Sequence, residues 1–362
     1  MLRALEIGGR RVDDDSDCFV IAEIGHNHQG RLDQALELVD AAAACGASAV
    51  KLQKRDNRAL FTAEMYDSIY NSENAFADTY GAHRDLLEFG RDEYVAMRER
   101  AEKHGLLFFS TAFDKPSADF LHDLDMPAYK IASGDLTNIP LITYIAGFGK
   151  PMIMSTGGGT MDDVRRAYHA VRPINPNFAI LQCTSGYPPN FEELNLNVIK
   201  TFREEFPDVQ IGLSSHDSGI AMALVGYVLG ARIIEKHFTL NRAMKGTDHA
   251  FSLERQGLSK LVRDLKRARI SMGDGVKRTY DSEKAPLKKM AKSLVASRDL
   301  PAGHVLTTED VIAKSPGGHL PPYRLEDLLG VRLPAAMRRD EPFREEQIPA
   351  NDIAAAAGGS AE

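Results

Sequence analysis

The stretch CFVIAEIG at positions 18–25, followed by LDQALELVDAAAA at 32–44 and ASAVKLQ at 47–53, sets the pattern of this sequence. Short apolar runs that alternate with amphipathic stretches of helical length are typical of parallel βαβ units. We therefore expect two buried strands, at 18–25 and 47–53, connected by a helix at 32–44. The unit predicts a parallel sheet covered by helices.

The same pattern recurs along the chain. Further buried strands are expected at 106–113, 128–133, 151–156, 178–184, 209–215 and 231–239. Helices are expected at 92–104, 161–171, 198–206 and 220–229, and a longer one, at 257–272, follows the eighth strand. Eight such units favour an α/β fold of the (β/α)8 TIM-barrel type over a doubly wound sheet, which has about five or six strands.

Polar residues stand at the end of nearly every expected strand. Because the carboxyl ends of barrel strands meet on one face, where active sites are built, these residues predict a site there. They are Glu23, Gln53, Thr111, Ser133, Ser155, Thr184, Ser214 and His237.

The chain is expected to hold two folded parts. Residues 1–273 form the barrel, in which the long polar insertion at 55–90 is expected to be a lid or disordered. A charged stretch without apolar periodicity, at 274–292, is predicted to be a linker. Short strands and turns then indicate a compact module at 293–350, and the Ala- and Gly-rich tail at 351–362 is expected to be disordered.

Composition excludes several classes of protein. The net charge of −7 argues against a nucleic-acid binder, which usually carries a basic surface. No apolar run reaches the length of about 18 residues that spans a bilayer, and the amino terminus lacks the apolar core of a signal peptide. Cys18, Cys45 and Cys183 show no metal-type spacing. We therefore expect a cytoplasmic protein with reduced cysteines.

Two histidines at neighbouring strand ends suggest a metal site. His216 follows the seventh strand and His237 ends the eighth, with Glu235 two residues earlier. Residues i and i+2 of a strand share a face, so Glu235 and His237 can both point into the barrel. Imidazoles with a carboxylate suit a divalent cation such as Mn, Fe, Co or Zn. The alternative is that each histidine is an ordinary core or loop residue.

Lysines near strand ends suggest that anions bind at the same face. Lys51, Lys130 and Lys236 occupy such positions, and Lys130 lies among apolar residues, where a buried ammonium group needs an anionic partner. A structural ion pair is the alternative. Hydroxyl groups of Ser133, Ser155 and Ser214, with glycines at 134 and 157–159, add to a phosphate-binding pattern.

Carboxylates at this face are candidates for proton transfer. Glu23 ends the first strand, Glu235 lies in the eighth, and Asp248 lies in the turn that follows it.

Several strings in this sequence resemble one family, the sialic acid synthases. They are AEIGHNHQG at 22–30, KLQK at 51–54, KIASGD at 130–135, MSTG at 154–157, QCTSGYP at 182–188, GLSSH at 212–216, EKHFTL at 235–240, KGTDH at 245–249 and SLE at 252–254. The C-terminal module resembles the SAF (antifreeze-like) domain of this family. The resemblance covers about residues 15–350.

The resemblance implies an activity and an assembly. The family condenses phosphoenolpyruvate with an N-acyl hexosamine of the N-acetylmannosamine type to form a nine-carbon 2-keto acid, with release of phosphate. It uses a divalent metal, Mn with Mg or Co as alternatives. The resemblance also implies a domain-swapped homodimer in which the SAF domain crosses to the neighbouring barrel.

The same resemblance assigns roles to residues. The metal ligands fall on His216 and His237. The catalytic and sugar-contacting carboxylates fall on Glu23, Glu235 and Asp248, and Glu235 lies near the reacting carbon. The substrate-binding groups fall on Lys51, Gln53, Thr111, Lys130, Ser133, Ser155, Ser185, Tyr187 and Ser214.

The sequence departs from the family at two positions. Bacterial members often carry Asn where this chain has Ser185, and Ser315 stands where an Arg of the SAF domain often reaches the sugar's N-acyl group. Arg55 or Arg324 is a candidate replacement for that Arg. The segment at 320–327 is more similar to animal members, which use a 6-phosphorylated amino sugar.

Two other functions are open at this point. Lysines at barrel strand ends also suit a Schiff-base aldolase that acts on pyruvate and a sugar aldehyde. The other alternative is a non-catalytic carbohydrate-binding protein.

Overall fold

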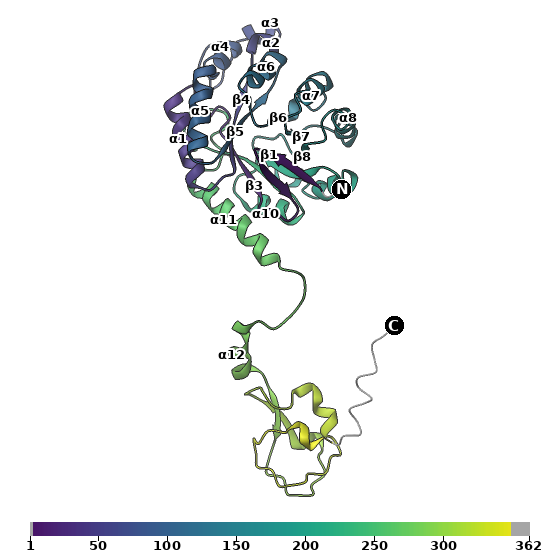
Figure 1. The fold of residues 1–362 in the computed structure, drawn as a ribbon. Helices are drawn as coiled ribbons and strands as arrows, with labels where there is room; N and C mark the ends of the chain where they lie inside the picture. Colours follow the sequence, from purple (N-terminus) through teal and green to yellow (C-terminus); the bar gives the residue numbers. More distant parts are fainter. Residues whose placement is uncertain (1–2, 349–362) are drawn as a thin grey trace. The chain divides into compact units, whose positions relative to one another are not determined.

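The computed structural model describes residues 3–348, and the chain divides after Gly273 into two compact units (Figure 1). The first unit is a closed barrel of eight parallel strands in the order β10-β3-β4-β5-β6-β7-β8-β9. The predicted (β/α)8 barrel is therefore confirmed. The strands are β3 (Phe19–Glu23), β4 (Ala49–Lys54), β5 (Leu107–Ala112), β6 (Tyr129–Ile131), β7 (Met152–Ser155), β8 (Phe178–Cys183), β9 (Gln210–Ser215) and β10 (Ile233–His237).

Helices surround the barrel and cover its apolar outer face (Figure 1). In the first of them, Ala35, Leu38, Val39 and Ala42 are fully buried, and this three- and four-residue spacing places all of them on the face toward the strands. The helices are α1 (Leu32–Ala44), α5 (Arg91–Lys103), α6 (Lys115–Asp123), α7 (Ile139–Ala146), α8 (Met161–Val171), α9 (Val198–Glu205), α10 (Ala221–Val228) and α11 (Arg255–Met272).

A β-hairpin that the sequence analysis did not anticipate precedes the barrel. Its strands, β1 (Ala4–Ile7) and β2 (Arg10–Asp13), pair antiparallel around Gly8 and Gly9, which both have positive φ. The side chains of Leu5, Ile7 and Val12 pack with residues from the amino-terminal halves of the barrel strands. The hairpin therefore adds apolar side chains to that end of the barrel. A Gly-Gly pair between short alternating runs is a signal by which such a hairpin can be recognised.

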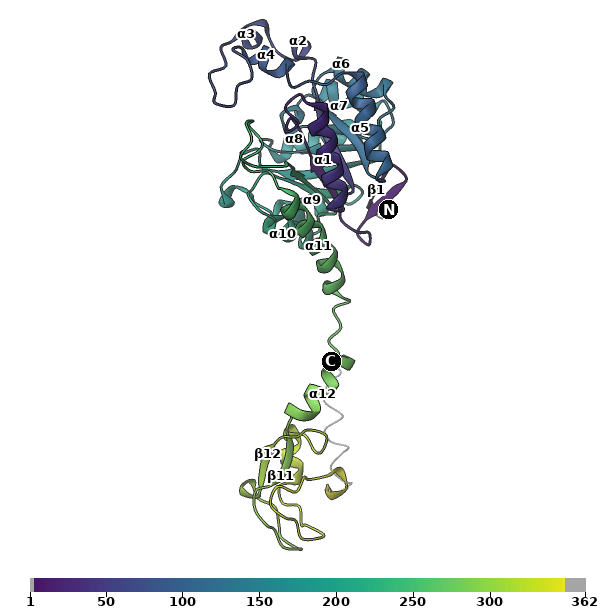
Figure 2. The same ribbon diagram turned by 90° about the vertical axis from the view of Figure 1, so that its left-hand side faces the viewer.

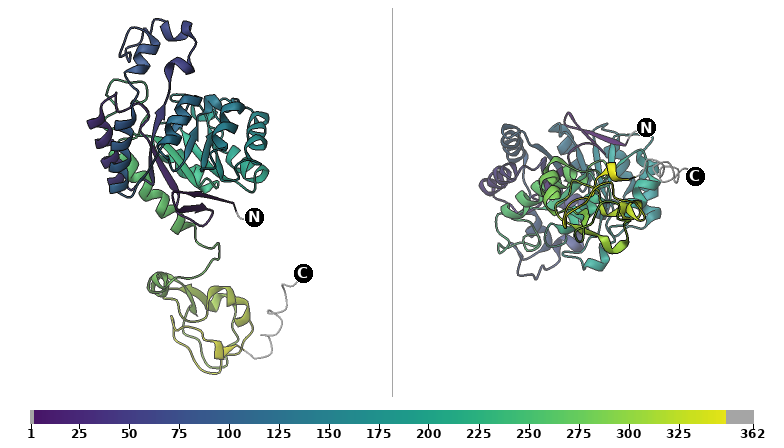
Figure 3. Two further views of the ribbon diagram at one scale, coloured as in Figure 1. Left: turned by 45° about the horizontal axis from the view of Figure 1, so that its top comes forward. Right: turned by 90° about the horizontal axis from the view of Figure 1, so that it is seen from below.

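The insertion after β4 holds three short helices rather than a structureless loop. They are α2 (Asn57–Leu60), α3 (Ala63–Asp67) and α4 (Tyr80–Asp85), and they project beyond the barrel in Figure 2 and in the left view of Figure 3. Thr62 and Thr79 accept hydrogen bonds from the first turns of α3 and α4. The expectation of disorder is therefore wrong, because these caps and the ring contacts of Tyr70 with Tyr80 and His83 supply local order.

The second unit begins at Asp274 and has its own apolar core. Its elements are α12 (Asp281–Met290), β11 (Ser293–Ala296), η3 (Thr308–Asp310), β12 (Val311–Lys314), η4 (Pro322–Leu328) and η5 (Glu345–Gln347). Leu294, Leu306, Leu328, Leu333 and Phe343 are almost fully buried in it.

The stretch predicted to be a linker is not wholly irregular, because α12 occupies about half of it. The side chain of Glu283 accepts a hydrogen bond from the backbone N–H of Tyr280 and caps this helix. The predicted tail at 351–362 lies outside the described residues. Among residues 3–348, no helix is long and apolar enough to cross a membrane.

Candidate active site

A cavity of about 510 Å³ opens at the carboxyl ends of the barrel strands. All of the catalytic, substrate-binding and metal-binding residues that the family resemblance assigns line it, and their roles remain predictions. Arg55, Arg84, Phe113, Gly134 and Thr247 also line it. The predicted residues are Glu23, Lys51, Gln53, Thr111, Lys130, Ser133, Ser155, Ser185, Tyr187, Ser214, His216, Glu235, His237 and Asp248.

Lys51 lines the cavity and is almost fully buried. The register of β3 and β4 places it opposite Glu23, and its Nζ lies 2.6 Å from Glu23 Oε2. It also donates a hydrogen bond of 2.8 Å to Thr111 Oγ1 and lies 4.0 Å from Glu235 Oε2. Burial raises the pKa of Glu23, against the effect of Lys51.

Lys130 forms a second buried cluster with the end of β7. Its Nζ donates to Ser155 Oγ at 2.6 Å and lies 3.9 Å from Glu235 Oε1, which also accepts a hydrogen bond of 3.1 Å from Ser214. Burial lowers the pKa of Lys130. Burial also acts to raise the pKa of Glu235, but Lys130 and Lys51 outweigh it and hold that pKa below its usual value. Glu235 is therefore an ionised group shared by two ammonium groups.

The two carboxylates thus differ in protonation behaviour although both are buried. At Glu23 burial outweighs the effect of Lys51, whereas at Glu235 the two lysines, together with His237 and Ser214, outweigh burial. Pairs of carboxyl groups with pKa values pushed apart are typical of sites that use one as acid and the other as base.

His216 and His237 lie side by side, with their ring centroids 5.3 Å apart. The Nδ1 of His216 lies 3.1 Å from the carbonyl oxygen of Thr184, so this nitrogen donates and Nε2 is left as the acceptor. The Nδ1 of His237 is buried without a hydrogen-bond partner and lies 3.6 Å from Asp248 Oδ2. Burial lowers the pKa of His237 to about 4, so its ring is neutral at pH 7.

These features fit a divalent cation in part. A metal-bound histidine usually donates its other ring N–H to a carbonyl or carboxylate, as His216 does to Thr184. Within residues 3–348, however, no group of three His, Cys, Asp or Glu side chains is arranged to hold a metal ion. The protein would therefore supply two imidazoles, and water or substrate oxygens would complete the coordination. The metal remains a prediction.

Gly157 brings a loop close to the site. Its backbone N–H donates to Ser133 Oγ at 3.0 Å. A Cβ atom at this position would lie 2.0 Å from Ser185 Oγ and 2.8 Å from Ser133 Oγ, so a larger residue would displace both hydroxyl groups. The glycine thus lets two hydroxyl groups and a backbone amide converge, as anion-binding loops require.

Two residues that the sequence groups with the site lie elsewhere. Lys236 points away from the cavity and pairs with Asp217 at 2.9 Å, because adjacent strand residues face opposite sides of the sheet and Glu235 and His237 face inward. Thr184 donates its hydroxyl to the carbonyl oxygen of Glu193 and does not line the cavity.

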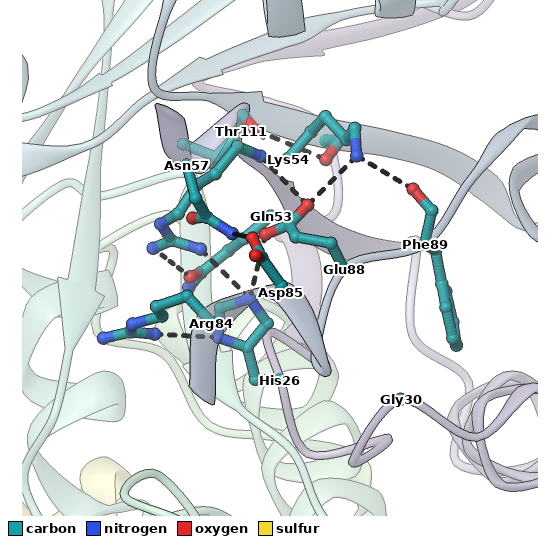
Figure 4. A network of polar contacts seen from close by, with 12 residues as sticks. His26, Gly30, Gln53, Lys54, Asn57, Arg84, Asp85, Glu88, Phe89 and Thr111 are labelled. Atoms are coloured by element: carbon teal, nitrogen blue, oxygen red, sulfur yellow. Dashed lines mark hydrogen bonds and ion pairs between the residues drawn. The ribbon is translucent and has the colours of Figure 1, made fainter. Parts of the chain in front are cut away.

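Arginine contributes to the cavity in a way that the sequence only partly indicated. Arg55 follows β4 directly, whereas Arg84 comes from α4 in the insertion, and only the folded chain brings it to the cavity. Figure 4 shows Arg84 beside His26. Arg324, the other candidate to replace the missing SAF-domain arginine, is paired with Asp327 and Glu345 in the second unit.

Comparisons with known proteins give a consistent result. The NeuB family matches residues 38–277, and the SAF domain matches residues 291–349. N-acetylneuraminate-9-phosphate synthase of Homo sapiens is 38% identical over 94% of this chain and 95% of its own. N,N'-diacetyllegionaminic acid synthase of Legionella pneumophila is 34% identical over 87% of this chain and 90% of its own.

A solved structure agrees with these sequences. N-acetylneuraminic acid synthetase of Leptospira borgpetersenii, in complex with citrate, superimposes with a TM-score of 0.67 at 33% identity. The match covers 79% of this chain and 96% of that one.

Proposed function

This chain belongs to the NeuB family, and we propose from this that it is an enzyme which condenses phosphoenolpyruvate with the open-chain aldehyde of an N-acyl hexosamine. The product is a nine-carbon 2-keto acid of the sialic or nonulosonic type. Family membership does not decide whether the acceptor sugar is free or 6-phosphorylated. One relative that matches most of this chain is named for a phosphorylated product, and another is named for an unphosphorylated one.

The reaction joins two carbons and uses one water molecule. C3 of phosphoenolpyruvate attacks the aldehyde carbon, and the aldehyde oxygen takes up a proton to become a hydroxyl. Water adds at C2 and loses a proton. Phosphate then leaves from the tetrahedral intermediate, and C2 becomes the ketone.

The anionic substrate fits the lysine end of the cavity. Lys51 and Lys130 provide two buried ammonium groups, and Thr111 and Ser155 provide hydroxyl groups within hydrogen-bond distance of them. An ammonium group in a site shielded from water attracts an anion more strongly than it would in solution. This end can therefore hold phosphate and carboxylate.

The carboxylates supply proton transfer. Glu235 is held ionised by the two lysines, so it can accept the proton of the attacking water. Glu23, whose pKa is raised, can donate a proton toward the aldehyde oxygen or bind the hydroxyls of the sugar. Gln53 donates to Glu23 Oε1 at 2.8 Å and fixes its orientation.

His216 and His237 would hold a divalent cation, which would polarise the aldehyde when bound. The cation proposed first is Mn, with Mg or Co as alternatives. Asp248 Oδ2 lies 3.6 Å from Nδ1 of His237, the nitrogen that has no hydrogen-bond partner.

The observation that carries the proposal is the placement of Glu235 between Lys51 and Lys130 in the cavity. The test is phosphate release from phosphoenolpyruvate with a panel of hexosamines, with and without 6-phosphate and with and without Mn²⁺. Release that depends on a hexosamine, with a nine-carbon product seen by mass spectrometry, supports the proposal. Release without any sugar contradicts it.

A Schiff-base aldolase is the second candidate, since burial lowers the pKa of Lys130 and thus favours a nucleophilic amine. In that case borohydride with pyruvate would trap a covalent adduct on Lys130, and chelators would have no effect. Phosphoenolpyruvate-dependent turnover without an adduct favours the condensation.

We extend the proposal to a cytoplasmic homodimer in which the SAF domain of one chain covers the barrel of its partner. The reacting enol phosphate needs protection from water, and all three cysteines are free thiols, which suits a reducing compartment. The test mixes a chain truncated near Lys289 with a full-length His237→Ala chain. Recovered activity in mixed dimers supports the arrangement, and inactive mixed dimers contradict it.

A further inference from the structure

Two guanidinium groups form one wall of the cavity and face the same imidazole. Arg55 Nη1 lies 3.1 Å from Nε2 of His26, and Arg84 Nη1 lies 3.1 Å from Nδ1 of the same ring. His26 and Arg84 are both visible in Figure 4. Arg55 also donates to Gln53 Oε1 at 2.7 Å and lies with its Cζ 3.7 Å from the centre of the Phe113 ring.

These contacts cannot all be hydrogen bonds. A guanidinium group only donates, and a neutral imidazole accepts at one nitrogen alone. In either tautomer of His26, one arginine N–H therefore points at a ring N–H. Protonation of the ring would leave both contacts unfavourable, and burial, together with the two arginines, holds the pKa of His26 well below its usual value. One guanidinium N–H at this wall thus needs another acceptor.

No carboxylate within residues 3–348 forms an ion pair with either arginine. Glu88, which is labelled in Figure 4, pairs with Lys54 at 3.1 Å and lies 3.6 Å from His26 Nε2. Asp248, which also lines the cavity, lies against His237. Arg55 is nevertheless buried, with only 9% of its surface exposed. A buried charge without a partner lowers the stability of the fold.

The arginine wall lies at the opposite end of a continuous chain of contacts from Lys130. That chain passes from Arg55 to Gln53, then to Glu23 and Lys51, and finally through Glu235 to Lys130. At the lysine end each ammonium group has a carboxylate nearby. At the arginine end neither guanidinium group has one.

We propose that Arg55 and Arg84 form a second anion subsite, which binds a phosphomonoester carried by the acceptor sugar at the end remote from its aldehyde. The proposal rests on the proposed function, because it takes the lysine end to be the place of phosphoenolpyruvate. Two guanidinium forks without counter-ions match a dianion with several oxygens, whereas the carbonyl of an N-acyl group offers one neutral acceptor.

The test compares two acceptors that differ only in phosphate, N-acetylmannosamine 6-phosphate and N-acetylmannosamine, at saturating phosphoenolpyruvate. The variants are Arg84→Gln, which removes the charge from a half-buried position, and Arg84→Lys, which keeps it. Arg58→Gln is the matched control, because Arg58 belongs to the same insertion but is exposed and stacks on Tyr66. Thermal unfolding of each variant checks that the insertion is intact.

The wild type is expected to prefer the 6-phosphate. Arg84→Gln should lower the ratio of kcat/KM for the phosphorylated over the free sugar by about 10- to 100-fold, the range for lost hydrogen bonds between charged groups. Arg84→Lys should restore part of the ratio, and Arg58→Gln should leave it unchanged. An equal fall for both sugars would mean that Arg84 binds a group common to both and would overturn the proposal. So would a rise confined to the KM for phosphoenolpyruvate, or a wild type without preference.

A binding measurement separates this inference from the proposed reaction. If neither sugar is converted, the proposed function fails, and calorimetry with N-acetylmannosamine 6-phosphate alone then tests the subsite. Binding to the wild type that is lost in Arg84→Gln supports the subsite. Absence of binding to the wild type overturns it.

Discussion

The two ends of one barrel are built from the same eight strands and differ in almost every physical property. At the amino-terminal end, Leu5, Ile7, Phe19, Ile153 and Ile233 belong to a cluster of buried apolar side chains. At the carboxyl end, the same strands continue into lysines, glutamates and histidines around a cavity of about 510 Å³. β10 shows the change within five residues, from Ile233 to His237.

This difference separates stability from chemistry. Apolar burial contributes to folding free energy in proportion to the area removed from water. Buried charges contribute little net stability, and an imidazole nitrogen without a partner, such as Nδ1 of His237, costs stability. We expect substitutions at the apolar end to change the free energy of unfolding, and those at the polar end to change turnover.

The largest expected effect is at the polar end of β10. His237→Ala should lower kcat/KM by at least about 1000-fold, since a bound cation contributes several kcal/mol of charge stabilisation. Its free energy of unfolding should change by less than about 1 kcal/mol, because the lost ring carries a buried nitrogen without a hydrogen bond. Phosphate release and urea unfolding measure the two quantities. A chelator should inactivate the wild type and Mn²⁺ restore it, whereas full activity of metal-stripped protein would remove the metal from the site.

The next largest effect distinguishes the roles of two buried lysines. Lys130→Ala should raise the KM for phosphoenolpyruvate far more than that for the sugar, because a buried charge paired with an anion contributes about 2–5 kcal/mol. Lys236→Met is the matched control, since Lys236 is equally buried but pairs with Asp217 on the other side of the sheet. It should lower stability and leave the ratio of the two KM values unchanged. Equal changes in both KM values for Lys130→Ala would make Lys130 a structural residue.

The converse substitution lies at the apolar end of the same strand. Ile233 is fully buried, so Ile233→Ala should lower the free energy of unfolding by about 2–4 kcal/mol through lost contacts and a cavity. Ile233→Val should cost about 1 kcal/mol. Both variants should keep kcat/KM within about three-fold of the wild type when folded. A large fall in kcat/KM of folded Ile233→Ala would show that the two ends are coupled, and would break the comparison.

The smallest expected effect is a loss of stability at acidic pH. The apolar cluster holds no titratable side chain, whereas His28 is buried in the loop after β3 and stacks on Phe89. Burial lowers the pKa of His28 from 6.5 to about 3, so the unfolded chain binds a proton that the folded chain does not. Stability is therefore lost as pH falls below about 6.5, by about 1 kcal/mol between pH 7 and pH 5.5. Unfolding in urea at both pH values should show a smaller loss in His28→Gln. Identical losses would mean that His28 does not contribute.

The fold was accessible from the sequence because its signal is local. Apolar runs at regular spacing give the strands, and their order along the chain gives the order around the barrel. The insertion at 55–90 was not accessible in the same way. Its polar composition resembles that of a loop, and its order depends on threonine caps and on ring contacts between residues such as Tyr70 and His83.

The same distinction applies to the residues of the candidate site. The side chains at the strand ends follow from the sequence, since alternation along a strand and the barrel's geometry bring Glu23, Lys130 and His237 to one face. Alternation also turns Lys236 to the outer side of the sheet, but the folded chain alone supplies its partner there, Asp217. Only the folded chain brings Arg84 from a distant helix to share His26 with Arg55. Strand ends follow from periodicity, but ion pairs and charges left without partners depend on distances between residues far apart in the chain.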